Sequence, residues 1–310
     1  MQLFASGNGV LGTVARGKYS HYSSIEEFEY CFMDKNVVPQ SDPPSAKDVD
    51  LLYKFLDHSH KLMVLTGAGI STEAVKLIMA ENADSFANIY IEFVRSKHAR
   101  RRYWARSYAG WRRFTAAQPG PTHAALASLE KVGCIDFMVT QNVDRKYVPR
   151  QWALAVESTE SGHPGSEKSF GMQQRPDGDI EIDEKFWEED FVIPNCQHCN
   201  GLLKPDVVFF GDNVPKDRAD KAMEAAKGCD SFLVVGSSLM TMSAFRLVRA
   251  AADTGANVAI VNIGETRADD FVPLKINARC GEGLLIVSDF AKIAPYGVPC
   301  HTSFCVTMMS

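Results

Sequence analysis

Short apolar runs alternate with amphipathic segments along much of the chain. Apolar runs that end abruptly in small or polar residues predict buried strands. We expect strands at Leu62–Leu65, Ile135–Thr140, Val207–Phe210, Phe232–Val235 and Val258–Ile263. Apolar positions at helical spacing predict helices from the capping residue Ser45 to Leu56 and over Ala124–Lys131, Arg218–Lys227 and Met242–Ala252. Because strands that alternate with helices need crossover connections, we expect an α/β fold with a mostly parallel sheet.

Small or polar residues follow the predicted strands, and they are the first candidate for function. In a doubly wound parallel sheet the carboxyl ends of the strands line the ligand crevice. Four groups stand there: Gly67-Ala68-Gly69, Thr140-Gln141-Asn142-Val143-Asp144, Gly236-Ser237-Ser238 and Asn262-Ile263-Gly264. Glycines let the backbone approach a pyrophosphate, and hydroxyl and amide side chains bind ribose or phosphate. Any one group could be a plain strand-to-helix turn, but four of them favour a nucleotide site.

The glycine turn differs from the usual dinucleotide fingerprint. Thr72 stands where that fingerprint has its third glycine or alanine. An ordinary nicotinamide dehydrogenase is therefore disfavoured.

Composition narrows the class of protein. The chain has 310 residues, 45% of them hydrophobic, and a net charge of -5, which gives no general attraction to nucleic acid. No apolar run approaches the ~18 residues that a membrane-spanning helix needs. The basic run from Arg95 to Arg106 could bind an anionic partner, but a solvated helix face is the simpler interpretation. We expect an intracellular enzyme or binding protein with no nucleic-acid or membrane partner.

The cysteines include one closely spaced pair, Cys196-Gln197-His198-Cys199. This pair is half of a tetrahedral thiolate zinc site, which needs four ligands. No second pair at that spacing occurs in the sequence, and His163 and His198 are the possible substitutes. We therefore expect zinc to bind this chain weakly or not at all.

Five motifs in order give the chain a family resemblance. They are Thr66-Gly67-Ala68-Gly69-Ile70-Ser71, Thr140–Asp144, Leu203–Asp212, Gly236-Ser237-Ser238-Leu239 and Asn262-Ile263-Gly264. Together they resemble the sirtuins, which are NAD-dependent protein deacylases. Tyr103-Trp104-Ala105-Arg106 and Asp177-Gly178-Asp179 look most like the mitochondrial sirtuin-4 type. The resemblance implies a Rossmann-like parallel sheet with helices on both faces, a small zinc-ribbon and helical domain, acyl-lysine protein substrates and the mitochondrial matrix.

The resemblance also implies roles for individual residues. Gly67, Ala68 and Gly69 would cradle the NAD pyrophosphate. Gln141 and Asn142 would hold the nicotinamide-side ribose, and Asp144 would hold the carboxamide. Val143, between them, is a further cofactor-binding candidate. Phosphate and ribose contacts fall on Gly236, Ser237 and Ser238, and adenosine contacts on Asn262, Ile263, Gly264 and the backbone of Cys280. The catalytic candidates are Asn142, Asp144 and, as a displaced general base, His163. The metal candidates are Cys196 and Cys199, half of a zinc site.

Three segments depart from the sirtuin pattern. After Ser71 the Gly-Ile-Pro-type cofactor loop is absent, and after Asp144 the stretch leading to the catalytic His-Gly is replaced by other sequence. The first zinc Cys-x-x-Cys is missing as well. Two functions follow as alternatives: an NAD-dependent protein-lysine deacylase or ADP-ribosyltransferase, or an inactive NAD-binding variant.

The same patterns give the expected domain boundaries. Residues 1–44, closed by Pro39, Pro43 and Pro44, form an N-terminal tail that also resembles a mitochondrial transit peptide. Residues 45–285 form the catalytic domain, with its Rossmann-like part in 45–71, 115–144 and 203–285. The small domain would come from segments near 72–114 and 145–202. Residues 286–310 are expected to be a C-terminal tail.

Overall fold

The structure is a computed structural model. It describes residues 41–71, 89–116, 118–142, 173–174, 180–181, 191–193, 195–196, 199–284 and 304–307. In these ranges no helix is both long enough and apolar enough to cross a membrane. The predictions for Thr72–Asn88 and for most of 145–189 lie outside the described residues.

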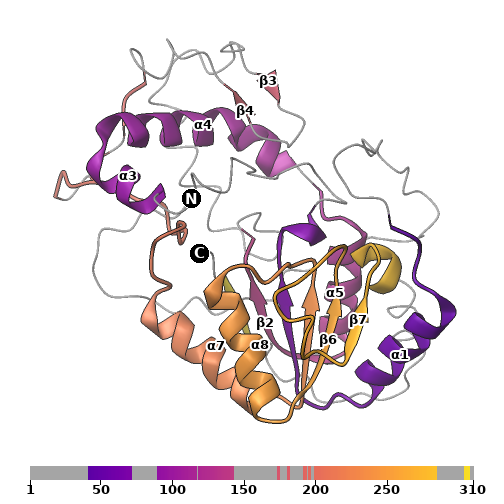
Figure 1. The fold of residues 1–310 in the computed structure, drawn as a ribbon. Helices are drawn as coiled ribbons and strands as arrows, with labels where there is room; N and C mark the ends of the chain where they lie inside the picture. The colour runs from indigo at the N-terminus through magenta and orange to yellow at the C-terminus, as the bar shows by residue number, and fades with distance from the viewer. Residues whose placement is uncertain are drawn as a thin grey trace.

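A parallel sheet forms the centre of the molecule (Figure 1). Its six strands lie in the order β7-β6-β5-β1-β2-β8, and every neighbouring pair is parallel. The strands are β1 (Leu62–Thr66), β2 (Ile135–Thr140), β5 (Ser231–Val235), β6 (Asn257–Val261), β7 (Leu274–Ile276) and β8 (Phe304–Thr307). Because later strands are added on both sides of β1, the sheet has a switch point between β1 and β5, the place where doubly wound sheets bind ligands.

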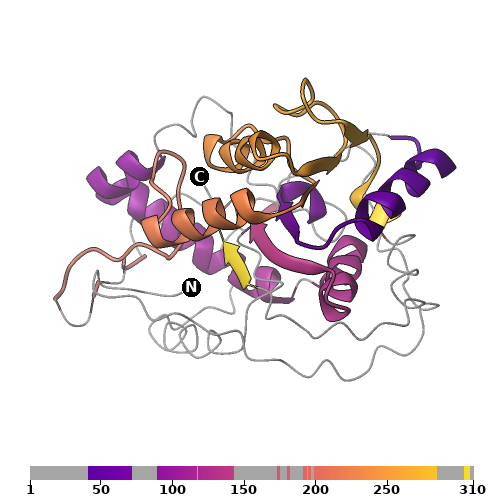
Figure 2. The same cartoon turned by 90° about the horizontal axis from the view of Figure 1, so that it is seen from below.

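Helices cover both faces of this sheet because its strands are apolar on both faces. On β1, Leu62 and Val64 pack in one apolar cluster, while Met63 and Leu65 pack in the other. The first cluster is covered by α1 (Ala46–Asp57) and α5 (Pro121–Lys131), the second by α7 (Lys216–Gly228) and α8 (Met242–Asp253). Figure 2 shows the orange helices α7 and α8 on the side of the sheet opposite α5. The predicted fold class is confirmed.

A separate apolar cluster lies outside the sheet. Helices α3 (Ile89–Arg95) and α4 (Lys97–Ala116) pack against the chain between Phe191 and Phe209, through Phe93, Trp104, Ala105, Phe191, Cys196, Leu203 and Phe209. Arg100 of the basic run donates hydrogen bonds to the carbonyl oxygens of Phe93 (2.9 Å) and Val94 (2.8 Å), so it caps the end of α3. Two short strands, β3 (Gln173–Gln174) and β4 (Ile180–Glu181), pair antiparallel. The domain boundaries themselves stay a prediction.

The structure corrects the sequence prediction at Val207–Phe210, which is not a strand. Instead, the Val207 amide donates to the Pro205 carbonyl (2.7 Å) and Phe209 packs edge-on against Phe93 and Tyr103. A short apolar run buried in a loop has the same pattern as a buried strand. The structure also adds two strands to the central sheet that the pattern does not predict, β7 and β8. Strand β8 comes from the expected C-terminal tail and pairs with β2 at the edge of the sheet.

Candidate nucleotide-binding site

The glycine turn after β1 is packed directly on the end of β5. The amide of Gly67 donates to the Val235 carbonyl (3.1 Å) and the amide of Gly69 to the Gly236 carbonyl (2.8 Å). A Cβ atom on Gly67 would lie 2.6 Å from the Gly236 oxygen, and one on Gly236 would lie 2.6 Å from the Ile70 nitrogen. Since real Cβ atoms do not come this close to backbone, only glycine fits at these positions. The two strand ends flanking the switch point are thereby joined.

Two polar groups at this turn are left for a ligand. Ala68 is exposed, and its amide has no hydrogen-bond partner within the part of the chain that the structure describes. The hydroxyl of Thr66 is fully buried at the end of β1 and likewise has no partner among the described residues. A buried hydroxyl without a partner in the protein calls for a water or a ligand as its partner. The turn therefore fits an anionic group such as a pyrophosphate, mainly through the Ala68 amide.

Gln141, directly after β2, connects three elements. Its amide nitrogen donates to the Thr241 hydroxyl (2.8 Å) at the start of α8, and its amide oxygen accepts from the Ser237 hydroxyl (2.6 Å) after β5. The Ser237 oxygen also accepts from the Leu239 amide (3.2 Å). Each group in this chain of bonds fixes the orientation of the next. The Gln141 side chain is thus held in one position at the crevice.

Asn142 is bound to the glycine turn itself. Its side-chain nitrogen donates to the Gly67 carbonyl (2.9 Å) and to the Ser71 hydroxyl (3.2 Å). The donors of this side chain are therefore used within the protein. Its amide oxygen has no hydrogen bond to any residue that the structure describes, which leaves an acceptor for a ligand hydroxyl.

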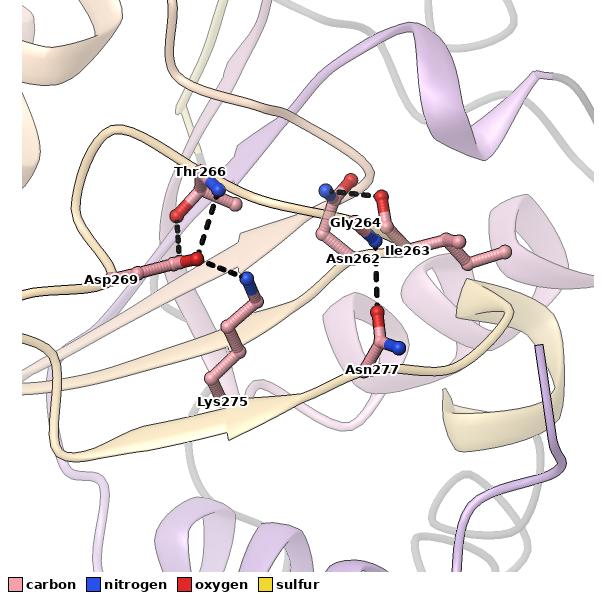
Figure 3. Close-up of polar contacts among 7 residues, drawn as sticks. All are labelled: Asn262, Ile263, Gly264, Thr266, Asp269, Lys275 and Asn277. Carbon is pink, nitrogen blue, oxygen red and sulfur yellow. Dashed lines mark hydrogen bonds and ion pairs between the residues drawn. The ribbon is translucent and has the colours of Figure 1, made fainter. Parts of the chain in front are cut away.

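The loop after β6 is shaped by the neighbouring strand β7 (Figure 3). The Asn262 amide donates to the Ile276 carbonyl (3.1 Å), and the Gly264 amide donates to the side-chain oxygen of Asn277 (2.8 Å). The Asn262 side chain donates to the Ile263 carbonyl (2.9 Å). Gly264 has φ +83°, a conformation that glycine adopts without strain. Asn277 therefore holds the loop that the sequence assigns to the adenosine side.

A partly buried charge cluster supports the same loop (Figure 3). Asp269 accepts from the Thr266 amide (3.0 Å) and hydroxyl, and it pairs with the Lys275 amine of β7. Burial raises the pKa of Asp269, but the hydrogen bonds from Lys275 and Thr266 outweigh that effect and leave the pKa below its ordinary value. The carboxylate is therefore ionised at neutral pH and ties the loop to β7.

The structure brings most of the predicted site residues to one edge of the sheet. Gly67, Gly69, Gln141, Asn142, Gly236 and Ser237 are linked to one another by hydrogen bonds or backbone contact. Ser238 accepts from the Arg267 amide (3.0 Å), and the Cys280 thiol donates to the Val261 carbonyl (3.5 Å) beneath the Asn262 loop. Val143, Asp144 and His163 lie outside the described residues. Their roles stay predictions.

Sequence reasoning missed several residues that hold this site. Thr66, Ser71, Thr241 and Asn277 contact or flank the predicted residues. Thr241 had a usable signal, because it directly precedes a predicted helix. No pattern in the sequence points to Asn277, because its partner Gly264 lies thirteen residues away.

The two candidate metal ligands lie at a different place, on the α3–α4 side of the molecule. Cys196 is buried in the aromatic cluster and Cys199 is exposed, and neither forms a disulfide with another described residue. Across the described ranges, no group of three or more histidine, cysteine or acidic side chains could hold a metal ion. The described donors therefore do not fit a closed zinc site, which needs four.

The fold and this edge together define a Rossmann-like nucleotide-binding protein. Comparisons with known proteins show to which family of nucleotide-binding proteins the chain belongs. The Sir2 family model matches residues 166–243. An NAD-dependent protein deacylase SRT2 of Arabidopsis thaliana is 56% identical, over 84% of this chain and 81% of that protein. The NAD-dependent protein lipoamidase sirtuin-4, mitochondrial, of Homo sapiens is 38% identical, over 81% of this chain and 89% of its own length.

Solved structures agree with these relatives. A structure described as "Sir2-p53 peptide-NAD+" matches with a TM-score of 0.59 and 27% identity, over 79% of this chain and 99% of that one. The chain belongs to the Sir2 family, the sirtuins.

Proposed function

We propose that this chain is an NAD-dependent protein-lysine deacylase. The observation that carries the proposal is the convergence of Ala68, Asn142, Ser237 and Asn262 on the carboxyl edge of the sheet, beside the switch point between β1 and β5. The names of the relatives support it, since they describe NAD-dependent deacylases. The alternative of an inactive NAD-binding variant has no support from these comparisons.

Different residues of this chain would bind the pyrophosphate of NAD and orient its ribose. NAD, when bound, would supply the anomeric ribose carbon, to which the amide oxygen of an acyl-lysine would bond as the bond from that carbon to nicotinamide breaks. The Ala68 amide would hold the pyrophosphate, because it is an exposed donor on the glycine turn. The free amide oxygen of Asn142 would orient a ribose hydroxyl, and preorganised polar groups of this kind stabilise developing positive charge. Gln141 and Ser237 would keep that geometry rigid.

Three residues outside the described ranges complete the proposal. Asp144 would hold the nicotinamide carboxamide, and Val143 beside it would line the cofactor site. His163 would act as general base toward a ribose hydroxyl, since it is the only histidine between Asp144 and Cys196. These three assignments rest on sequence position.

The names of relatives support finer assignments, which are part of the proposal. Lipoyl and acetyl groups are the acyl groups that we propose as substrates. The human relative is named a lipoamidase, and an NAD-dependent protein deacetylase of Xanthomonas campestris is 38% identical over 75% of this chain. ADP-ribosyl transfer to proteins is a second use of the same site. We place the chain in the mitochondrial matrix, in line with the word mitochondrial in the name of the human relative.

The test measures removal of an acyl group from a lysine peptide, with NAD as co-substrate and mass spectrometry as readout. We expect turnover by the full chain, and a fall of about 10²–10⁴-fold for Asn142→Ala and for His163→Ala. The matched control is Asn257→Ala, at the exposed amino end of β6 on the opposite edge of the sheet, which should leave turnover unchanged. Turnover that is absent with every acyl group, in a folded chain that binds NAD, would contradict the proposal.

A further inference from the structure

The loop between β5 and α8, residues 236–241, contains a residue in an unfavourable backbone conformation. Leu239 has φ +58°, in the left-handed region that residues other than glycine rarely adopt. Its side chain is fully buried in the apolar cluster that α7 and α8 cover. Because a conformation of this kind persists only where the surrounding structure enforces it, the contacts around the loop decide whether Leu239 keeps its position.

Arg267, which follows β6, makes several contacts with this loop and with the start of α8. Its amide donates to the Ser238 carbonyl (3.0 Å), and its guanidinium donates to the Met240 carbonyl (3.0 Å). The same guanidinium nitrogen donates to the Met242 sulfur (2.9 Å). The guanidinium carbon also lies 5.4 Å from the centroid of the Phe245 ring. The Met242 sulfur is thus one of the groups that keep the Arg267 side chain on the loop.

The same loop orients the Gln141 side chain at the nucleotide site. The Ser237 hydroxyl donates to the Gln141 amide oxygen (2.6 Å), and the Thr241 hydroxyl accepts from the Gln141 amide nitrogen (2.8 Å). The Leu239 amide donates to the Ser237 hydroxyl (3.2 Å), so one hydrogen bond joins the strained residue to the site. If Arg267 releases the loop, Leu239 can relax and Gln141 loses its fixed orientation.

Met242 is open to solvent although its sulfur has a structural contact. The residue is 47% exposed. Oxidation converts a methionine thioether into a polar, chiral sulfoxide, and a peroxide is a sufficient oxidant. The O–O bond of hydrogen peroxide breaks, one oxygen atom bonds to the sulfur, and the other leaves as water. The sulfur loses two electrons, which the peroxide gains.

Oxidation removes the contact between Met242 and Arg267, whichever lone pair of the sulfur takes the oxygen. The two lone pairs give the two sulfoxide epimers. An oxygen on the lone pair that faces the guanidinium would occupy the place of the guanidinium. An oxygen on the other lone pair leaves a positively polarised sulfur facing a cation. Because the sulfoxide oxygen accepts hydrogen bonds more strongly than a thioether sulfur, it also draws the guanidinium away from the Met240 carbonyl.

We propose that Met242 is a peroxide-sensitive modification site, whose sulfoxide releases Arg267 from the 236–241 loop and thereby weakens NAD binding. Met240 is the natural comparison. It is 58% exposed, but its side chain makes no hydrogen bond or ring contact with any residue that the structure describes, so its sulfoxide should leave the loop unchanged. The effect on NAD rests on the proposed function, whereas the oxidation and the release of the loop do not.

The experiment treats the full chain with dilute hydrogen peroxide and then with a phosphine, which reduces disulfides and sulfenic acids but leaves methionine sulfoxide in place. Peptide mass spectrometry measures the sulfoxide at each methionine. Hydrogen exchange without nucleotide follows the amides of Leu239 and Arg267, and calorimetry measures NAD affinity. We expect a Met242 sulfoxide, about tenfold faster exchange at both amides, and NAD binding weakened by about 3–10-fold.

Variants assign the effect to one sulfur. Met242→Leu has no sulfur to oxidise, so peroxide should change neither its hydrogen exchange nor its NAD affinity. The matched control Met240→Leu should keep the full sensitivity to peroxide. Met242→Gln carries an amide oxygen close to the position of the sulfoxide oxygen and should show the faster exchange without peroxide. Methionine sulfoxide reductases, one for each epimer, should restore the oxidised chain, and circular dichroism checks that each variant is folded.

Several results would overturn the proposal. A peroxide response of Met242→Leu equal to that of the unchanged chain would assign the effect to another residue. A Met242 sulfoxide with unchanged exchange at Leu239 and Arg267 would show that the sulfur does not hold the loop. Oxidation of Met240 without oxidation of Met242 would exclude the site. A chain that fails to bind NAD before any peroxide is added would contradict the proposed function instead, and the exchange rates would still decide whether oxidation releases the loop.

Discussion

Gly236→Ala tests the claim that backbone contact between the ends of β1 and β5 builds the site. Gly236 has φ +61°, where an alanine costs about 1–2 kcal/mol. Its new Cβ would also lie 2.6 Å from the Ile70 nitrogen and 2.7 Å from the Gly69 carbonyl carbon. Those are backbone atoms that cannot rotate away, so a further strain of about 1–3 kcal/mol follows. We expect a total loss of about 2–5 kcal/mol in the free energy of unfolding.

Gly255→Ala is the matched control for this substitution. Gly255 also has a positive φ, +86°, but a Cβ there would meet nothing within 4 Å. Gly255→Ala should therefore lower the free energy of unfolding only by the cost of the backbone conformation, about 1–2 kcal/mol. Gly69→Ala isolates the steric part, because a Cβ at Gly69 would lie 2.6 Å from the Gly236 Cα, while the backbone of Gly69 is not in the positive-φ region that alanine avoids.

The assay is urea unfolding followed by circular dichroism, with NAD affinity measured by calorimetry on the same samples. We expect Gly236→Ala and Gly69→Ala to weaken NAD binding, whereas Gly255→Ala should leave it unchanged. If Gly236→Ala is no less stable than Gly255→Ala, the close contact contributes nothing and the reasoning is refuted. Should Gly236→Ala fail to fold, Gly69→Ala carries the comparison.

Three smaller predictions concern single interactions. Asp269→Asn should lower the free energy of unfolding at pH 7 by about 1–2 kcal/mol. Because the pKa of Asp269 is lower in the folded than in the unfolded protein, its contribution is complete above the unfolded pKa and is lost as the pH falls through the folded pKa. The melting curves of the variant and the unchanged protein should therefore converge in acid. Ser237→Ala leaves the Gln141 oxygen without its donor and should weaken NAD binding measurably by calorimetry, with a stability loss of about 1 kcal/mol. Ser45→Ala removes the capping box of α1 and should cost about 1 kcal/mol in urea unfolding, with no effect on NAD; an equal loss of NAD affinity would contradict that separation.

Much of the sheet could be predicted from local pattern. The strand prediction at Ile135–Thr140 agrees with β2 at both ends, and Met242–Ala252 differs from α8 by one residue. These elements are predictable because a strand or helix buried on a core face shows its periodicity in consecutive residues. Strand β7 has only three residues, too few for any period to show. Val207–Phe210 has the apolar pattern of a strand but packs on aromatic rings instead of a neighbouring strand.

The sequence alone determined the class of fold, the glycine turn and the polar residues at the strand ends, because each of these is encoded by neighbouring residues. Only the tertiary structure decided which of them meet. That Gly236 must be glycine follows from its contact with Gly69, and the position of Gln141 follows from Ser237 and Thr241, about a hundred residues away. Strand β8 joins β2 from the far end of the chain. Such contacts depend on how the crossovers bring distant segments together, and no local periodicity records that.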